Sequence, residues 1–137
     1  MSYINSLLTH NGKIGKLGEN FACEFLVDKG HKILERNFKN KVGEIDIVST
    51  SLDARGNIKL HVVEVKTTQS QGIRAEENMN AVKMRKVGKL AEIYMKYAVF
   101  NGTVTHETPF CVDFIGVYLN YDSSLRKVEY IENLEIY

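Results

Sequence analysis

The chain has 137 residues, of which 44% are hydrophobic and 26% are charged, and its 18 Lys and Arg against 17 Asp and Glu give a net charge of +1. These values are typical of one globular domain and exclude disordered, collagen-like and disulfide-scaffold classes. No apolar run approaches the roughly 18 residues that a membrane span needs, and Met1–Gly12 lacks the pattern of a signal peptide. Cys23 and Cys111 lie in apolar segments, which favours buried thiols in the reducing cytoplasm over a disulfide.

The small net charge hides an uneven distribution along the chain. Residues 1–96 hold 16 basic and 11 acidic residues, or +5, whereas residues 97–137 hold 2 basic and 6 acidic residues, or −4. Such asymmetry hints at an anionic partner for the basic part, although ordinary surface scatter is the simpler explanation of this observation alone.

The first predicted element is a helix over Lys16–Lys29, where apolar residues recur at three- and four-residue spacing, namely Leu17, Phe21, Ala22, Phe25 and Leu26. Gly30 supplies the left-handed position that commonly ends a helix. Three strands are predicted next. They cover His31–Arg36, Val42–Thr50 and Ile58–Thr67, and the β-branched residues of the last two are typical of buried strands.

The rest of the chain completes one α/β pattern. The turn-rich segment Asp53–Asn57 predicts a hairpin loop, and Glu77–Tyr97 predicts a second helix with an apolar stripe of Met84, Val87, Leu90, Ala91 and Tyr94. Phe110–Tyr118 predicts a strand, Asn120–Ser124 a turn and Arg126–Ile136 a last strand. The order α-β-β-β-α-β-β predicts a single domain over residues 1–137, with a central mixed sheet and a helix on each face.

Two acidic residues and a lysine stand out in the hairpin strands. Side chains alternate faces along a strand, so Glu44 shares a face with Asp46, and Glu64 with Lys66. Folding the hairpin about Arg55 pairs positions whose numbers sum to 110. Asp46 then lies opposite Glu64, and Glu44 opposite Lys66. A slip of the register would change these partners.

Two opposed carboxylates require something that offsets their repulsion, which is about 3 kcal/mol at ~5 Å and an effective dielectric of ~20. A divalent cation is the natural candidate, since Mg²⁺ is held by one or two carboxylates together with water and phosphate oxygens. The alternative is a structural salt-bridge network with Lys66. Because Ile45, Ile47, Val63 and Val65 flank the acids, we favour a functional site.

An ordered series of short motifs resembles the YraN-like family of predicted endonucleases, which is placed near the archaeal Holliday-junction resolvases in the PD-(D/E)XK nuclease superfamily. The resemblance covers residues 12–118 or so and leaves residues 119–137 as a C-terminal strand extension. The motifs are Gly18-Glu19, Glu35-Arg36-Asn37, Gly43-Glu44-Ile45-Asp46, Val63-Glu64-Val65-Lys66 and Val112-Asp113-Phe114.

The resemblance implies a restriction-endonuclease-like three-layer fold and a Mg²⁺- or Mn²⁺-dependent endonuclease. Asp46 and Glu64 become the metal-binding carboxylates, and Lys66 the catalytic lysine. Glu19 becomes an outer acidic residue, and Glu44 either orients Lys66 or binds through water. The implied substrate is DNA, with branched DNA among the candidates. A homodimer is a further expectation, because resolvase-like relatives cut two strands.

Basic residues on both sides of the acidic strand could follow a phosphate backbone. The alternative is an ordinary solvated helix face. The candidate nucleic-acid-binding residues are Arg36, Lys39, Lys41, Lys83, Lys86 and Lys89.

Two other functions stay open at this point. Thr68 stands where a basic residue often follows the catalytic lysine, which would suit a nucleic-acid-binding module with little or no catalysis. A protein-interaction domain that uses its acidic end is the second alternative. The cysteines and the four histidines show no zinc-ligand spacing, so we predict structural roles for them.

Overall fold

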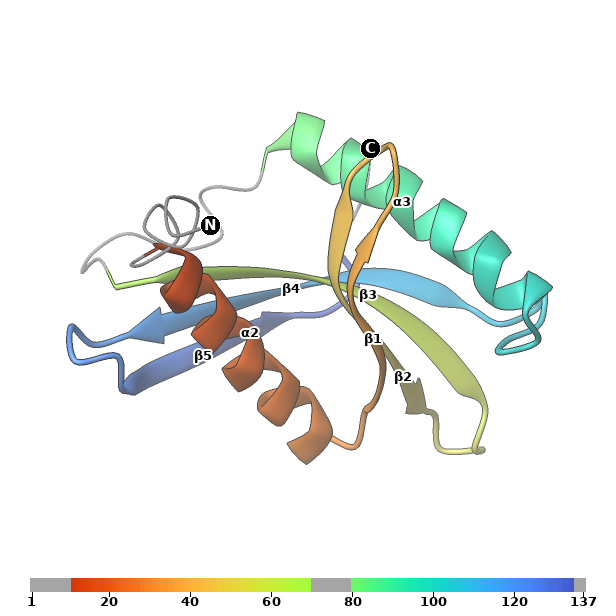
Figure 1. The fold of residues 1–137 in the computed structure, drawn as a ribbon. Helices are drawn as coiled ribbons and strands as arrows, with labels where there is room; N and C mark the ends of the chain where they lie inside the picture. Colours follow the sequence, from red (N-terminus) through yellow and green to blue (C-terminus); the bar gives the residue numbers. More distant parts are fainter. Residues whose placement is uncertain (1–10, 70–79, 135–137) are drawn as a thin grey trace.

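A computed structural model describes residues 11–69 and 80–134, which form two helices and five strands in the predicted order (Figure 1). Neither of these helices is long and apolar enough to cross a membrane. The elements are α2 (Asn11–Asp28), β1 (Lys32–Lys39), β2 (Glu44–Leu52), β3 (Ile58–Thr68), α3 (Ala81–Phe100), β4 (Phe110–Leu119) and β5 (Leu125–Ile131).

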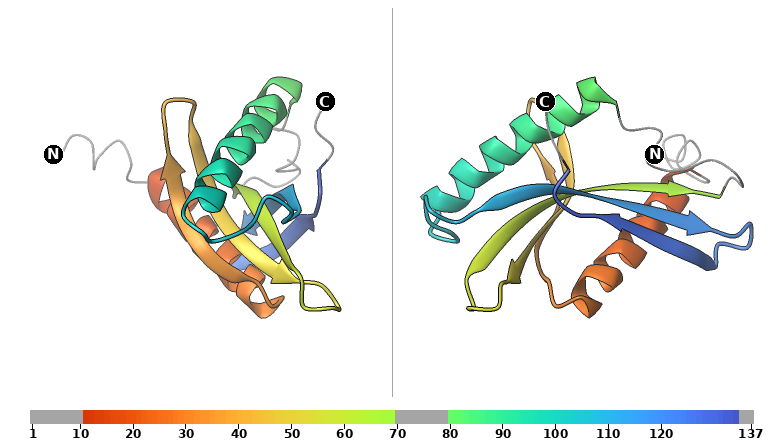
Figure 2. Two further views of the ribbon diagram at one scale, coloured as in Figure 1. Left: turned by 90° about the vertical axis from the view of Figure 1, so that its right-hand side faces the viewer. Right: turned by 180° about the vertical axis from the view of Figure 1, so that it is seen from behind.

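The strands form one mixed sheet in the order β1-β2-β3-β4-β5. Neighbouring strands are antiparallel except for β3 and β4, which are parallel because the chain crosses over through α3 between them. The sheet is strongly twisted, so that its two ends point in different directions (Figure 2). This arrangement confirms the predicted α/β class and the central mixed sheet.

Each helix covers one face of the sheet and forms its own core cluster, which makes three layers. Ala22 and Leu26 of α2 pack on Ile47 and Val63, and the buried stripe of α3 packs on the opposite face. The apolar stripes predicted for both helices therefore account for their packing. The buried residues of α3 are Val87, Leu90, Ala91, Tyr94 and Ala98.

Two glycines let the helices approach the strands closely. A Cβ atom at Gly18 of α2 would lie 1.8 Å from Thr67 Oγ1 of β3. A Cβ atom at Gly43, just before β2, would lie 2.9 Å from Lys86 Cε of α3. A larger residue at Gly18 would collide with Thr67, whereas one at Gly43 would mainly displace the flexible end of Lys86. Both glycines directly precede predicted acidic residues, Glu19 and Glu44.

Several predicted boundaries were wrong by a few residues. α2 begins at Asn11 rather than Lys16, and β1 continues to Lys39 rather than ending at Arg36. β5 ends at Ile131 because the chain turns away at Asn133, whose φ is +60°.

The other end points differ by three residues or fewer. α3 extends to Phe100, and Asn80 caps its first turn by accepting a hydrogen bond from Lys83 N–H at 3.0 Å. The predicted helix start at residues 77–79 and the predicted strand end at 135–136 lie outside the described residues.

We expect Gly18→Ala to destabilise the protein even though alanine is the better helix former by about 1 kcal/mol. The added methyl group meets Thr67, and such overpacking costs about 1–3 kcal/mol. Gly15→Ala is the matched control, because nothing lies within 4 Å of a Cβ atom there and a gain of about 0.5–1 kcal/mol is expected. Urea denaturation of both variants measures the difference, and equal stability would contradict the close contact.

Candidate functional site

The register of the β2–β3 hairpin brings Asp46 and Glu64 to neighbouring positions. The paired positions sum to 110, as predicted, and the ladder ends with the pair Ile47–Val63. At the next position the Asp46 carboxylate accepts a hydrogen bond from Val65 N–H at 2.8 Å. The Asp46 side chain thus accepts the hydrogen bond of a β3 backbone N–H group just beyond the last paired position of the two strands.

Burial is the main cause that raises the pKa values of both acids. Burial raises the pKa of Asp46 from its ordinary 3.8 to about 6, despite the hydrogen bond from Val65 N–H. Burial and the charge of Asp46 raise the pKa of Glu64 from 4.5 to about 8, although Lys66 and Lys83 act in the opposite direction. The charges of Lys66 and Lys83 therefore do not offset the free-energy cost of ionising both carboxyl groups.

A hollow of about 190 Å³ joins the acidic strands to α3. It is lined by Glu44, Glu64 and Lys66 together with Lys83 and Lys86. The structure thus places three of the predicted acidic and catalytic residues and two of the predicted phosphate-binding lysines around one space.

A second hollow, of about 280 Å³, lies on the α2 side of the same strand. Glu19 of α2 lines it, and so does Lys66, which therefore borders both hollows. Burial raises the pKa of Glu19, with the charge of Arg36 opposing and that of Glu44 adding to the shift. Glu19 consequently belongs to the same electrostatic cluster as the hairpin acids.

The other four candidate nucleic-acid-binding residues do not line the hollow that contains Lys83 and Lys86. Arg36 is exposed and reaches α2, where one guanidinium nitrogen lies 3.7 Å from Glu19 Oε1 and donates to Asn20 Oδ1 at 2.9 Å. Lys39 Nζ lies 4.0 Å from Glu44 Oε2, and Lys41 is exposed. Lys89 is directed away from the hollows, because a three-residue spacing drifts around a helix by about 60° per step.

A sequence comparison identifies the family. The profile of the family described as Uncharacterised protein family UPF0102 matches residues 18–117. The chain belongs to UPF0102. This confirms the resemblance to the YraN-like family, and the matched range contains all the site residues predicted above.

Relatives cover nearly the whole chain. A UPF0102 protein of Campylobacter hominis is 35% identical over 124 residues, which are 90% of this chain and 95% of the relative. A UPF0102 protein of Caldanaerobacter subterraneus is 35% identical over 121 residues, which are 88% of this chain and 92% of the relative. A third, from Campylobacter concisus, is 48% identical over 81 residues, or 59% of this chain and 67% of the relative.

This UPF0102 chain also contains a buried polar cluster that its sequence spacing did not predict. His61 Nδ1 lies 2.6 Å from Asp113 Oδ2, and the Cys111 thiol donates to Asp113 Oδ1 at 3.1 Å. Tyr130 O–H and Asn133 N–H donate to the same carboxylate at 2.5 and 2.9 Å. These four partners hold the pKa of Asp113 below its ordinary value although burial raises it.

The sequence shows no zinc-like spacing because His61 lies on β3, whereas Cys111 and Asp113 lie on β4. The two strands become neighbours only through their parallel pairing. The His61, Cys111 and Asp113 ligand atoms lie within 4.8 Å of one another, which is close enough to share a metal ion. Every buried side-chain nitrogen and oxygen in the described ranges nevertheless has a hydrogen-bond partner. The structural roles predicted for His61 and Cys111 stay a prediction, beside a donor set that could also hold a metal ion. A lone acid in the apolar run of β4 is the one signal that the sequence offered.

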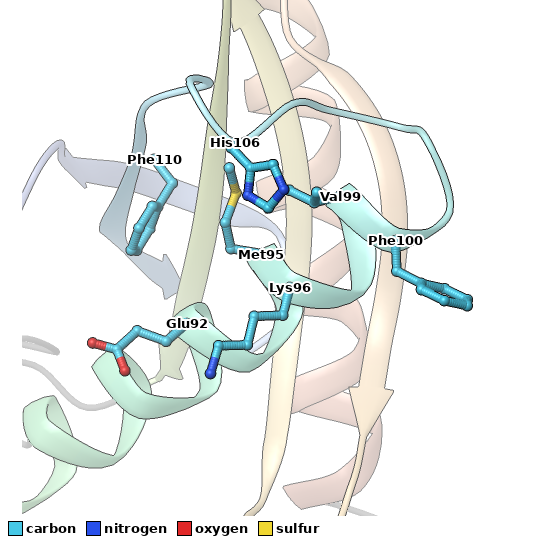
Figure 3. Close-up of a pocket in the computed structure, with 7 residues that line it drawn as sticks. All are labelled: Glu92, Met95, Lys96, Val99, Phe100, His106 and Phe110. Carbon is cyan, nitrogen blue, oxygen red and sulfur yellow. The ribbon is translucent and has the colours of Figure 1, made fainter.

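An apolar groove of about 470 Å³ lies on the opposite flank of α3 from the acidic hollow (Figure 3). Met95 and Phe110 face into it, whereas Phe100 points away and is 92% exposed. Lys89 lines an adjoining groove that shares Glu92 and Phe110 with this one. These grooves are therefore separate from the acidic cluster.

We expect Glu64→Gln to stabilise the metal-free protein at alkaline pH. Folding raises the pKa of Asp46 and Glu64, so the folded state binds more protons than the unfolded chain between about pH 4 and pH 8. The contribution of this pair to the free energy of unfolding must therefore fall as pH rises through that range. Denaturation in a chelator at pH 5 and pH 8.5 should show a smaller loss for Glu64→Gln than for the wild type. Parallel losses, with the exposed Glu24→Gln as control, would contradict the repulsion.

We expect Asp113→Ala to destabilise the fold by about 3–5 kcal/mol, since it leaves His61 and two other buried donors without their acceptor. Urea denaturation measures the loss, and the exposed Asp28→Ala provides the control. A change below about 1 kcal/mol would show that the cluster contributes little to stability.

Proposed function

We propose that this UPF0102 protein is a metal-dependent endonuclease that hydrolyses phosphodiester bonds of DNA, with branched DNA among its substrates. The observation that carries the proposal is the pair Asp46 and Glu64, half-buried just beyond the last ladder pair of β2 and β3, with Lys66 lining the same hollow as Glu64. A structural pair would be neutralised by its neighbours, whereas both of these carboxyl groups keep raised pKa values.

The donor set suits Mg²⁺ or Mn²⁺. Carboxylate oxygens are the ligands that these cations prefer, and one or two of them suffice when water and phosphate complete the shell. Asp46 commits Oδ2 to Val65 N–H, which fixes its orientation and leaves Oδ1 for an ion. The bound cation would polarise the scissile phosphate and lower the pKa of a water molecule.

The other residues have roles that follow from their places in the two hollows. Lys66 borders both, where its ammonium group would orient the attacking water and stabilise charge on the phosphate oxygens. Lys83 and Lys86 would contact the adjoining phosphates of the strand. Glu19 and Glu44 would bind the ion through water.

Calorimetric titration with Mn²⁺ tests the metal site. The wild type and Glu24→Gln should release or absorb heat on binding, because Glu24 is exposed on α2 and is not among the residues that line either hollow. Asp46→Asn should abolish the heat, since one of the two charged ligands is lost while its shape is kept. Absence of binding by the wild type would refute the proposal.

Cleavage of linear, flapped and four-way DNA and of structured RNA tests the reaction. Lys66→Met should reduce the rate by about 10²–10³ without loss of Mn²⁺ binding, because it removes one preorganised electrostatic group. Lys16→Met, at an exposed position of α2, is the matched control. If the wild type and Lys66→Met bind DNA equally and cleave none of these substrates, the protein is a nucleic-acid-binding module instead.

A further inference from the structure

Asn37 occupies an unusual position in the middle of β1. The flanking pairs Arg36–Ile47 and Phe38–Ile45 place it directly across from Asp46 on the neighbouring strand. Its φ is +57°, in the left-handed region that residues other than glycine and asparagine rarely adopt. A backbone outlier inside a strand, at the level of the acidic pair, calls for a specific reason.

The Asn37 side chain bridges two acidic residues from different elements. With its amide nitrogen turned toward them, it donates to Glu44 Oε1 of β2 at 2.9 Å and to Glu19 Oε1 of α2 at 3.2 Å. Both acids are close enough to Asp46 to interact with it electrostatically. One amide group therefore joins α2, β1 and β2 beside the proposed cation site.

An amide is well suited to this position because it is a neutral double donor. It draws two carboxylates together while leaving both of their negative charges in place, whereas lysine or arginine would cancel one of them. Arg36, which precedes Asn37, already lies 3.7 Å from Glu19. A second positive side chain at position 37 would therefore leave little negative charge to attract a metal ion.

We infer that Asn37 is a positioning residue, which holds Glu19 and Glu44 beside Asp46 as the outer acidic layer of the cation site. The inference rests on the proposed function in one respect, namely that Asp46 and Glu64 bind a divalent cation. Asn37 itself touches neither the ion nor the substrate. It acts through Glu19 and Glu44, which in turn orient water around the ion.

The backbone of Asn37 suggests a clean substitution. Asn37→Gly keeps the left-handed conformation without strain and removes only the amide group. Asn133→Gly is the matched control, because Asn133 has a φ of +60°, lies after β5 and keeps its backbone N–H bond to Asp113 when the side chain is removed. Both variants should fold, and thermal unfolding checks this directly.

Mn²⁺ titration by calorimetry then measures the effect on the cation site. We expect Asn37→Gly to weaken Mn²⁺ binding by about 10-fold, which is the lower end of the cost of losing a group that orients metal ligands. Asn133→Gly should bind Mn²⁺ like the wild type. The loss should largely disappear when Asn37→Gly is made in a Glu19→Gln, Glu44→Gln double variant, because the groups that Asn37 orients no longer carry charge.

The outcomes separate this inference from the proposed function. Equal Mn²⁺ affinity of the wild type and Asn37→Gly overturns the inference and leaves the metal site intact. A 10-fold loss of Mn²⁺ affinity that persists in the Glu19→Gln, Glu44→Gln background also overturns the inference, because Asn37 would then not act through these two acids. Absence of Mn²⁺ binding by the wild type overturns both.

Discussion

The repulsion between Asp46 and Glu64 is the constraint around which the rest of the site is arranged. The hairpin register fixes their positions, and neither strand can move aside, because β1 and β4 pair with their outer edges. The helices close both faces. The sheet therefore cannot relieve the repulsion by local relaxation, and this repulsion adds to burial, which is the main cause of the raised pKa values.

Two aspartates of the sheet, Asp113 and Asp46, lie in opposite electrostatic environments. Asp113 accepts hydrogen bonds from four groups, and its pKa is lowered although it is fully buried. Asp46 accepts one from Val65 N–H, faces three other carboxylates, and its pKa is raised. The surroundings thus favour the charged form of the side chain at Asp113 and disfavour it at Asp46.

The sequence predicted the features that depend on local periodicity. The register from Ile47–Val63 to Leu52–Ile58 followed from a short hairpin loop, and the helix faces followed from apolar spacing. The predicted pairs Asp46–Glu64 and Glu44–Lys66 lie beyond the end of that ladder. The sequence missed the features that depend on tertiary context. The left-handed Asn37 has no local signal in a strand, and the contact of His61 with Asp113 exists only because parallel strands 52 residues apart become neighbours.

The formal charge around the two hollows does not explain the raised pKa values of Asp46 and Glu64. Three acids and three lysines line the two hollows, so their formal charges balance, yet the pKa values of Asp46 and Glu64 stay high because burial is the largest cause of both shifts. More lysines at the rim would not change that, since their charge acts through solvent. A divalent ion between the carboxylates would offset the burial directly and would give a neutral pocket the positive charge that a phosphodiester requires. The lining residues are Glu19, Glu44 and Glu64, with Lys66, Lys83 and Lys86.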